Sequence, residues 1–256
     1  IRHYMIKRSL YFGNPSYLCL QNAQLLVRLP EVEKNSEFTD IFKKEAAASI
    51  PVEDIGVVVL DHKQITITQA LIEALLENNV ALVTCNTTHH PTGLMLPLCV
   101  NTLQNERFRL QLDASEPLKK QLWAQTVSQK IKNQAFVLSS RGIDNSYLIP
   151  LYKNVKSGDS ENCEATAAAY YWPHLFKNLP GFHRFREGRA PNNFLNYGYA
   201  ILRATMARSI VGAGLLPTLG IHHANRYNAY CLADDLMEPY RPVVDIIVCD
   251  IIKKHG

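Results

Sequence analysis

The sequence lacks any run of apolar residues long enough to cross a membrane, although 47% of its 256 residues are hydrophobic. We therefore expect a soluble globular protein, with one large domain or two small ones. The six cysteines lie far apart, no C-x-x-C pair occurs, and we recognise no secretory leader. This pattern predicts reduced thiols and a cytoplasmic location. Residues 1–4 precede Met5, where we expect the natural chain to begin.

A strong charge imbalance is also missing. The formal net charge is +4, a mildly basic balance that permits nucleic-acid binding without requiring it. No G-x-x-x-x-G-K-[ST] loop is present, so the sequence offers no P-loop nucleotide site. Internal repeats and low-complexity tracts are absent as well.

The apolar pattern divides the chain into a β-rich part and a helical part. Short β-type blocks dominate up to about Asn86: residues 9–12, 17–29 with a turn at 21–23, 56–61, 65–68 and 81–86. One helix interrupts them at 69–79, with Thr68 as its N-cap. Residues 87–98 are interpreted as a connector because proline and glycine mark them. Helical periods follow at 101–112, 116–138, 161–176 and 192–216.

The stretch GIHHANRYNAYCLADDLMEPYRP, residues 220–242, carries two adjacent histidines and three acids. On a helix, Asp235 and Glu238 share one face, whereas Asp234 points elsewhere. An imidazole beside two carboxylates can bind Mg²⁺ or Mn²⁺, and a further ligand would come from another segment. Taken singly, each residue is equally well explained as a hydrogen-bonded histidine or a solvated acid.

Glu164 is the candidate for that further ligand. It opens EATAAAYYW, whose small residues allow close helix packing, so its carboxylate is expected in a crevice. The alternative is that Glu161 and Glu164 only favour the positive N-terminus of the helix. The residues themselves leave both possibilities open.

Four segments in this order give the chain a resemblance to a known family. They are RSLYFGNPSYLCLQNAQLLV, EATAAAYYW, NNFLNYGYAILRA and GLLPTLGIHHANRYNAYCLADDLMEPYRP. From Met5 to its end, the chain resembles the CRISPR-associated adaptation endonucleases and integrases, which insert new spacers, and most closely those of type II systems. The resemblance implies an α+β fold, with an N-terminal β-sandwich-like dimerisation domain at 5–90 and a larger all-α catalytic domain at 101–256. It also implies that the natural protein continues beyond Gly256.

The resemblance implies which residues act. Glu164, His223 and Glu238 would bind Mg²⁺ or Mn²⁺, and Asp235 would assist from the same helix. His222 stays open as a rival to His223, because a doubled histidine blurs the Gly-x-x-His pattern that begins at Gly220. The implied reaction is attack of a DNA 3′-hydroxyl on a phosphodiester of the repeat array, with water as the nucleophile in the nuclease reaction.

Contacts with DNA are expected at Asn196, Tyr197, Arg203 and Arg226, through phosphate neutralisation and stacking. Tyr197 could instead be a core residue, and Arg203 could pair with an acid. Residues 117–134 form a helix with a basic face, which we interpret as solvated rather than DNA-binding. Cys85, His89, His90 and Cys99 lack the spacing of a structural zinc site.

The implied partners are double-stranded DNA, as spacer donor and repeat target, a second copy of the chain, and the second CRISPR-associated adaptation subunit. No membrane partner is expected. Two other functions stay open: a metal-dependent repair nuclease without integrase activity, and a non-catalytic DNA-binding scaffold whose acids only stabilise helices.

Overall fold

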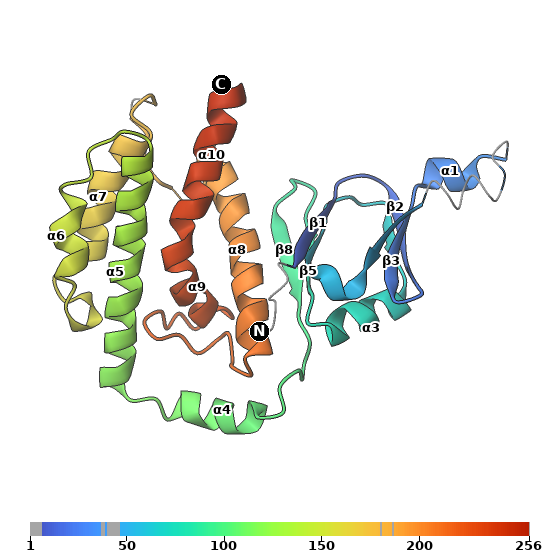
Figure 1. Ribbon diagram of the computed structural model, residues 1–256, viewed down its shortest axis with the longest axis horizontal. Coiled ribbons are helices and arrows are strands. Elements are labelled where there is room, and N and C mark those ends of the chain that lie inside the picture. Colours follow the sequence, from blue (N-terminus) through green and yellow to red (C-terminus); the bar gives the residue numbers. More distant parts are fainter. Residues whose placement is uncertain (1–6, 37–38, 40–46, 180, 186, 256) are drawn as a thin grey trace, which may run out of the picture. The chain divides into compact units, whose positions relative to one another are not determined.

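A computed structural model describes residues 7–36, 39, 47–179, 181–185 and 187–255. Residues 1–4 and Met5, the expected natural start, lie outside the described residues. Contacts divide the chain into two compact units, one of residues 1–104 with 211–214 and one of 105–210 with 215–256. The structure is a mixed α+β fold with its strands in the N-terminal part, as the sequence predicts (Figure 1).

In the described part of the first unit, the strands form two four-stranded sheets. One has the order β1 (Arg8–Phe12), β5 (Ile55–Leu60), β7 (Ala81–Cys85) and β8 (Pro91–Met95), and the other β4 (Ala48–Pro51), β3 (Gln24–Arg28), β2 (Ser16–Gln21) and β6 (Ile65–Ile67). A short helix α1 (Pro30–Lys34), the turn η1 (Val52–Asp54) and helix α3 (Gln69–Glu77) complete it. Five consecutive buried residues in β5, between β1 and β7, explain its unbroken apolar sequence.

Apolar side chains from both sheets and α3 form one core in this unit. Leu18 and Leu25 come from one sheet, Val58 and Leu82 from the other, and Leu71 from α3. The expected turn at 21–23 is present, because Gln21 pairs with Gln24 across Asn22 and Ala23, which both have positive φ. Thr68 stands at the N-cap of α3, also as expected, but its side chain makes no capping hydrogen bond.

The interpretation of residues 87–98 as a plain connector is wrong, since Pro91–Met95 form strand β8. Among the described strands, β8 pairs only with β7 and lies at the edge of its sheet. A proline is tolerated there because the first residue of an edge strand needs no ladder hydrogen bond. The proline and glycine of this segment suggest a loop, but pairing with β7 stabilises it as a strand.

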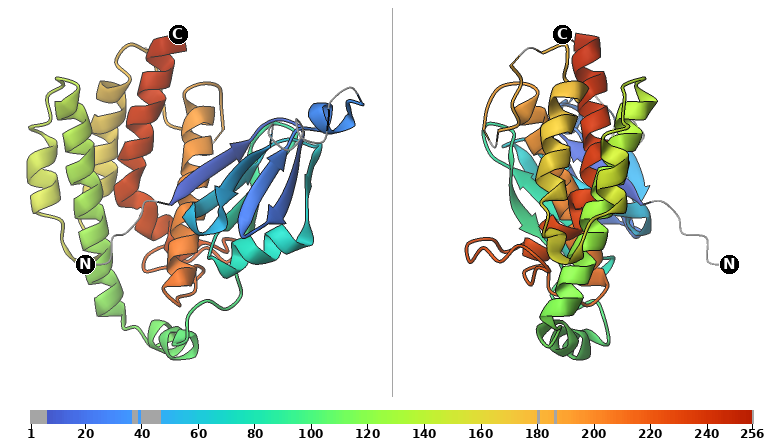
Figure 2. Two further views of the ribbon diagram at one scale, coloured as in Figure 1. Left: turned by 45° about the vertical axis from the view of Figure 1, so that its right-hand side comes forward. Right: turned by 90° about the vertical axis from the view of Figure 1, so that its left-hand side faces the viewer.

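The second unit is helical. Its elements are α4 (Gln104–Leu112), α5 (Glu116–Ser140), α6 (Leu148–Lys153), η2 (Ser157–Asp159), α7 (Cys163–Leu175), α8 (Asn192–Gly212), α9 (Cys231–Met237), η3 (Glu238–Tyr240) and α10 (Arg241–His255). The long helix α5 packs against α6, α7 and α10 (Figures 1 and 2). Buried Trp123, Ile131, Tyr171, Leu195 and Met237 belong to its core.

Close approach of α8 and α10 depends on Gly198. A Cβ atom at this position would lie 2.4 Å from Val244 Cγ1, so a larger residue would force the two helices apart. The contact brings Tyr199 of α8 within hydrogen-bonding distance of Asp245 on α10.

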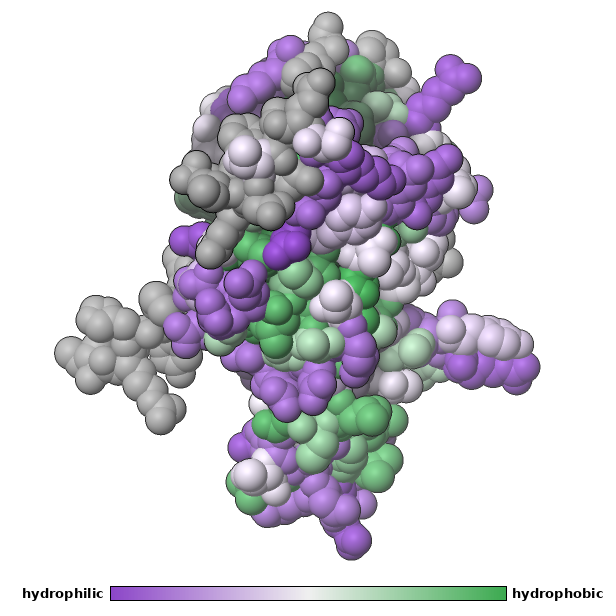
Figure 3. Space-filling model, turned by 90° about the vertical axis from the view of Figure 1, so that its right-hand side faces the viewer, coloured by the Kyte–Doolittle hydropathy of each residue, from purple (hydrophilic) through white to green (hydrophobic). Residues whose placement is uncertain are grey.

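In the described part of the chain, no helix is both long enough and apolar enough to cross a membrane. Hydrophobic side chains nevertheless reach the surface, and they gather in patches on the face drawn in Figure 3. In the first unit, the exposed large apolar residues include Tyr11, Leu29, Met95 and Leu98.

Candidate metal centre

Asp235 organises the loop that carries the two histidines. Its carboxylate is completely buried on α9 and accepts hydrogen bonds from the backbone N–H groups of Ile221 (2.7 Å) and His222 (2.9 Å). The backbone N–H and the Nδ1 atom of His223 also contact this carboxylate. Because Nδ1 is engaged, Nε2 is the ring nitrogen that His223 can offer to a ligand.

Gly220 is required for this loop conformation. A Cβ atom there would lie 2.3 Å from the His223 carbonyl oxygen and 2.8 Å from Asp235 Oδ2. The glycine of the Gly-x-x-His pattern thus allows the loop to close tightly over the carboxylate.

The two histidines are held in different ways. His222 stacks flat on Trp123 of α5, with ring centroids 4.1 Å apart, whereas His223 meets the same indole edge-on at 5.8 Å. Among the described residues, His223 is the histidine whose ring is bound by Asp235. The His222 imidazole is thus positioned by aromatic packing.

Glu164 lies in the first turn of α7, with its side chain 28% exposed. The start of this helix is fixed by Asp159, whose buried carboxylate accepts hydrogen bonds from the backbone N–H groups of Cys163 (2.8 Å) and Glu164 (3.1 Å). The negative charge of Asp159 also suits the positive end of the helix. Asp159 therefore positions the backbone that carries Glu164.

Lys130 of α5 bridges the two predicted glutamate ligands. Its Nζ atom lies 2.5 Å from Glu164 Oε1 and 2.6 Å from Glu238 Oε2. Burial alone would lower the pKa of Lys130, but the charges of Glu238 and Glu164 outweigh it and raise the pKa. This corrects the interpretation of residues 117–134, because Lys130 does not belong to a solvated basic face.

Glu238 is buried at the start of η3, directly after α9. Its Oε1 atom forms an ion pair with Arg241 (2.9 Å). The side chain of Asn133 on α5 donates a hydrogen bond to the carbonyl oxygen of Pro239, the residue after Glu238 (2.6 Å). Among the described residues, Glu238 Oε2 has no aligned hydrogen-bond donor, although Lys130 lies close to it. A buried anionic oxygen without a hydrogen bond is suited to binding a cation.

His223 lies within electrostatic range of both glutamates. Its hydrogen bond to Asp235 is the main factor that raises its pKa, burial opposes the change, and the charges of Asp235, Glu238 and Glu164 add to it. Two carboxylates and one imidazole nitrogen form a donor set that fits Mg²⁺ or Mn²⁺. In the side-chain positions of the described residues, however, no three His, Cys, Asp or Glu groups are close enough to hold a metal.

Behind the glutamates lies a buried polar cluster on α7, α8 and α10. The hydroxyl groups of Tyr171 (2.9 Å) and Tyr199 (2.5 Å) donate hydrogen bonds to the two oxygens of Asp245. The Arg241 guanidinium lies 4.8 Å from the centroid of the Tyr199 ring and pairs with Glu238. The cluster thus connects the α8–α10 contact to one of the predicted ligands.

The predicted DNA-contacting residues have different partners within the protein. Arg203 forms a two-point ion pair with Asp234 (2.6 and 3.1 Å), and Asn196 accepts a hydrogen bond from Arg184 (2.6 Å). Tyr197 is half-buried, while Arg226 is exposed and contacts Tyr227. Asp234 therefore faces Arg203 and does not take part in the cluster around His223.

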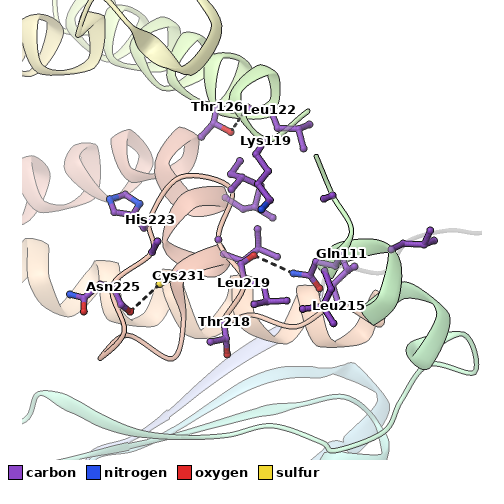
Figure 4. Close-up of a pocket in the computed structure, with 18 of the residues that line it drawn as sticks. Gln111, Lys119, Leu122, Thr126, Leu215, Thr218, Leu219, His223, Asn225 and Cys231 are labelled. Carbon is purple, nitrogen blue, oxygen red and sulfur yellow. Dashed lines mark hydrogen bonds between the residues drawn. The ribbon is translucent and has the colours of Figure 1, made fainter. Parts of the chain in front are cut away.

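A cavity of about 950 Å³ adjoins His223. Its walls come from α4, α5, the loop 215–226 and α9, and its labelled lining residues are Gln111, Lys119, Leu122, Thr126, Leu215, Thr218, Leu219, His223, Asn225 and Cys231 (Figure 4). Most of its lining is apolar, but Arg107, Lys119 and Arg226 add positive charge. The cavity opens beside the ring that Asp235 holds.

Sequence reasoning missed three residues of this site: Lys130, Asp159 and Arg241. The spacing of Lys130, seven residues after Trp123 on the same helix, places both side chains on one face and was the available signal. Asp159 lies three residues before Asn162, the N-cap of α7, so the usual capping pattern does not identify it. Nothing in the sequence pairs Arg241 with Glu238 except their i, i+3 spacing.

The chain is similar in sequence and in fold to known proteins. The family model described as "CRISPR associated protein Cas1" matches residues 25–256. The CRISPR-associated endonuclease Cas1 of Neisseria meningitidis serogroup C (strain 8013) is 40% identical over 98% of this chain and 77% of its own length. Two solved structures share the fold. One is a casposase bound to integration product, with a TM-score of 0.71, 24% identity, and coverage of 98% of this chain and 74% of that one. The other is a partial Cas6-RT-Cas1–Cas2 complex, with a TM-score of 0.61, 23% identity, and coverage of 98% of this chain and 77% of that one.

Proposed function

The chain belongs to the CRISPR-associated Cas1 family, and from this we propose that it is a divalent-metal-dependent DNA integrase that inserts spacer DNA into a repeat array. Membership of a family of CRISPR-associated endonucleases supports a DNA nuclease or integrase role in CRISPR adaptation. One observation carries the finer proposal. Glu164 and Glu238 both contact the buried ammonium group of Lys130, and the charges of the two glutamates also act on His223.

In this proposal Glu164, His223 and Glu238 bind Mg²⁺ or Mn²⁺, which would orient the attacking oxygen and neutralise charge on the phosphate. Asp235 holds the Nδ1 side of the His223 ring, which leaves Nε2 as the nitrogen for the metal. Arg241 holds one oxygen of Glu238, and Asp159 holds the first turn of α7. Asp235 and Asp159 are buried, and such supports restrict how far the segments that carry His223 and Glu164 can move.

The nucleophile follows from the reaction. The donor's 3′-hydroxyl forms a new phosphodiester bond, and the target strand's own 3′-oxygen leaves with the electrons of the broken P–O bond. One P–O bond replaces another, so the exchange needs no ATP. The nuclease reaction differs only in using water as the attacking group.

We propose double-stranded DNA and a second adaptation subunit as partners. A structural neighbour is described as a casposase bound to integration product, and another as a complex containing Cas1 and Cas2. Arg226 is the best-placed of the proposed DNA contacts, because it is exposed and lines the cavity beside His223. Asn196, Tyr197 and Arg203 complete the proposed set.

The proposed function is tested with a labelled duplex donor, a supercoiled repeat-bearing plasmid, a Cas2 partner and Mn²⁺. Donors with a free 3′-hydroxyl are expected to join the target, whereas donors with a 3′-phosphate or dideoxy end bind but do not join. Binding is retained because phosphate contacts do not depend on the terminal hydroxyl. Equal joining of both donors would contradict the mechanism.

Controls separate the proposal from its two rivals. Glu238→Ala should abolish joining and metal-dependent cleavage while the fold is retained, and Glu161→Ala, at an exposed glutamate paired with Lys156, should leave both unchanged. Cleavage without joining, in the presence of active Cas2, would favour a repair nuclease. Absence of both activities in the unmodified protein would favour a DNA-binding scaffold.

A further inference from the structure

We propose that the ammonium group of Lys130 competes with the metal ion for the Glu164 and Glu238 carboxylates. Without metal it holds these two carboxylates, and a divalent cation must displace it to bind. This inference rests on the proposed function, because it assumes that the two glutamates are metal ligands. It assigns Lys130 a role in positioning the ligands and setting their affinity for metal.

The lysine nitrogen contacts both carboxylates that the proposed function assigns to the metal. Nζ lies 2.5 Å from one glutamate oxygen and 2.6 Å from the other, and the side chain is only 13% exposed. An ammonium group and a metal ion cannot occupy the same space between these oxygens. Binding of one cation therefore excludes the other from this position.

Charge balance explains why a lysine is needed there without metal. Asp235 is paired with His223, and one oxygen of Glu238 is paired with Arg241. The other Glu238 oxygen and Glu164 contact Lys130, which is thus the cation between the two glutamates. Without a cation, two carboxylates in a largely buried place would repel each other and move apart.

The geometry also makes the lysine replaceable. Lys130 Nζ donates a hydrogen bond to Glu164 Oε1, and its contact with Glu238 Oε2 is an ion pair of 2.6 Å, so two charge contacts from one side chain hold both glutamates. Lysine is a single charge on a flexible four-carbon chain, and its side chain can rotate away without movement of α5. A divalent ion would bring twice the charge of the ammonium group to the two carboxylates.

Lys130→Met tests the proposal through metal binding, measured by calorimetry, and through thermal unfolding with EDTA or with Mn²⁺. We expect the variant to unfold at a lower temperature than the unmodified protein in EDTA. We also expect it to bind Mn²⁺ about tenfold more tightly, because no charge has to be displaced. The rise in unfolding temperature caused by Mn²⁺ should therefore be larger in the variant.

Lys132→Met is the matched control, since Lys132 lies on the same helix and is exposed. It should leave both Mn²⁺ affinity and the metal-induced shift unchanged. If Lys130 were only a structural ion pair, Lys130→Met would lower stability without strengthening Mn²⁺ binding. An Mn²⁺ affinity equal to or weaker than that of the unmodified protein would overturn the proposal.

A second measurement needs no variant and so does not depend on folding of Lys130→Met. Lysine acetylation of the unmodified protein is followed by mass spectrometry with EDTA and with Mn²⁺. Labelling of Lys130 should increase when Mn²⁺ displaces it, while labelling of Lys132 stays constant. Unchanged labelling of Lys130 at saturating Mn²⁺ would overturn the proposal. If the unmodified protein neither binds Mn²⁺ nor joins DNA, the proposed function itself fails.

Discussion

His222 and His223 are neighbours in sequence, but different contacts hold their rings, and this gives the first prediction at the scale of single residues. His223→Ala removes the imidazole that Asp235 positions, so Mn²⁺ should no longer stabilise the protein. At a metal concentration about 100 times Kd, the stabilisation lost would be about 2.7 kcal/mol. His222→Ala loses its stack on Trp123, worth about 0.5–1.5 kcal/mol, and should keep the metal response.

Thermal unfolding with and without Mn²⁺ measures both effects. Both variants should be compared with the unmodified protein in EDTA, which isolates the cost of the lost packing. If the metal response disappears in His222→Ala and persists in His223→Ala, the assignment of the ligand is reversed.

Asp245 gives a prediction about pH. Burial raises its pKa to about 6, although hydrogen bonds from Tyr199 and Tyr171 oppose the change. An unfolded aspartate has a pKa of about 3.9, so the folded state binds this proton more tightly. Its contribution to stability is therefore complete below about pH 3.9 and is lost as the pH rises through about 6.

Asp245→Asn removes this titration but retains the shape of the side chain. As the pH rises from about 4 to about 7, the free energy of unfolding should fall by about 2–3 kcal/mol in the unmodified protein relative to the variant. Urea unfolding in EDTA, followed by circular dichroism, measures the difference. Parallel curves for the two proteins would show that Asp245 does not change its protonation in this range.

At the scale of elements, the spacing of apolar residues predicts helices and hairpins well where a segment's own sequence determines its structure. The helices at α5, α7 and α8 and the hairpin of β2 and β3 begin and end near the expected residues. Strand β8 was missed because its stability comes from pairing with β7, and its proline and glycine suggest a loop when read alone.

Local sequence also predicts only part of the candidate site. Glu164, His223 and Glu238 were identified through resemblance, and their separation in sequence gave no direct indication that one lysine would connect two of them. Lys130 lies on a helix whose repeated lysines suggest a solvated face, and only the packing of α7 and η3 against α5 buries it. A buried charge of this kind depends on contacts between distant segments, which local periodicity does not encode.

At the scale of the whole molecule, we expect a symmetric dimer formed through the first unit, because two strands of a repeat must be cut a fixed distance apart. The strand that the sequence predicts at residues 25–29 is a candidate for part of this interface. In the structure β3 has β2 and β4 on either side, so it cannot pair with another strand, and Leu25 is buried. Leu29 at its end is 45% exposed and can still contact a second copy.

Mass measurement in solution at micromolar concentration tests this expectation. The unmodified protein should be a dimer, and Leu29→Glu should shift it toward monomer because a charge would be buried at the interface. Leu110→Glu, at an exposed leucine of α4 in the second unit, is the control and should remain dimeric. A stable monomer of the unmodified protein would contradict the dimer, and an unaffected Leu29→Glu dimer would place the interface elsewhere on the first unit or on the second.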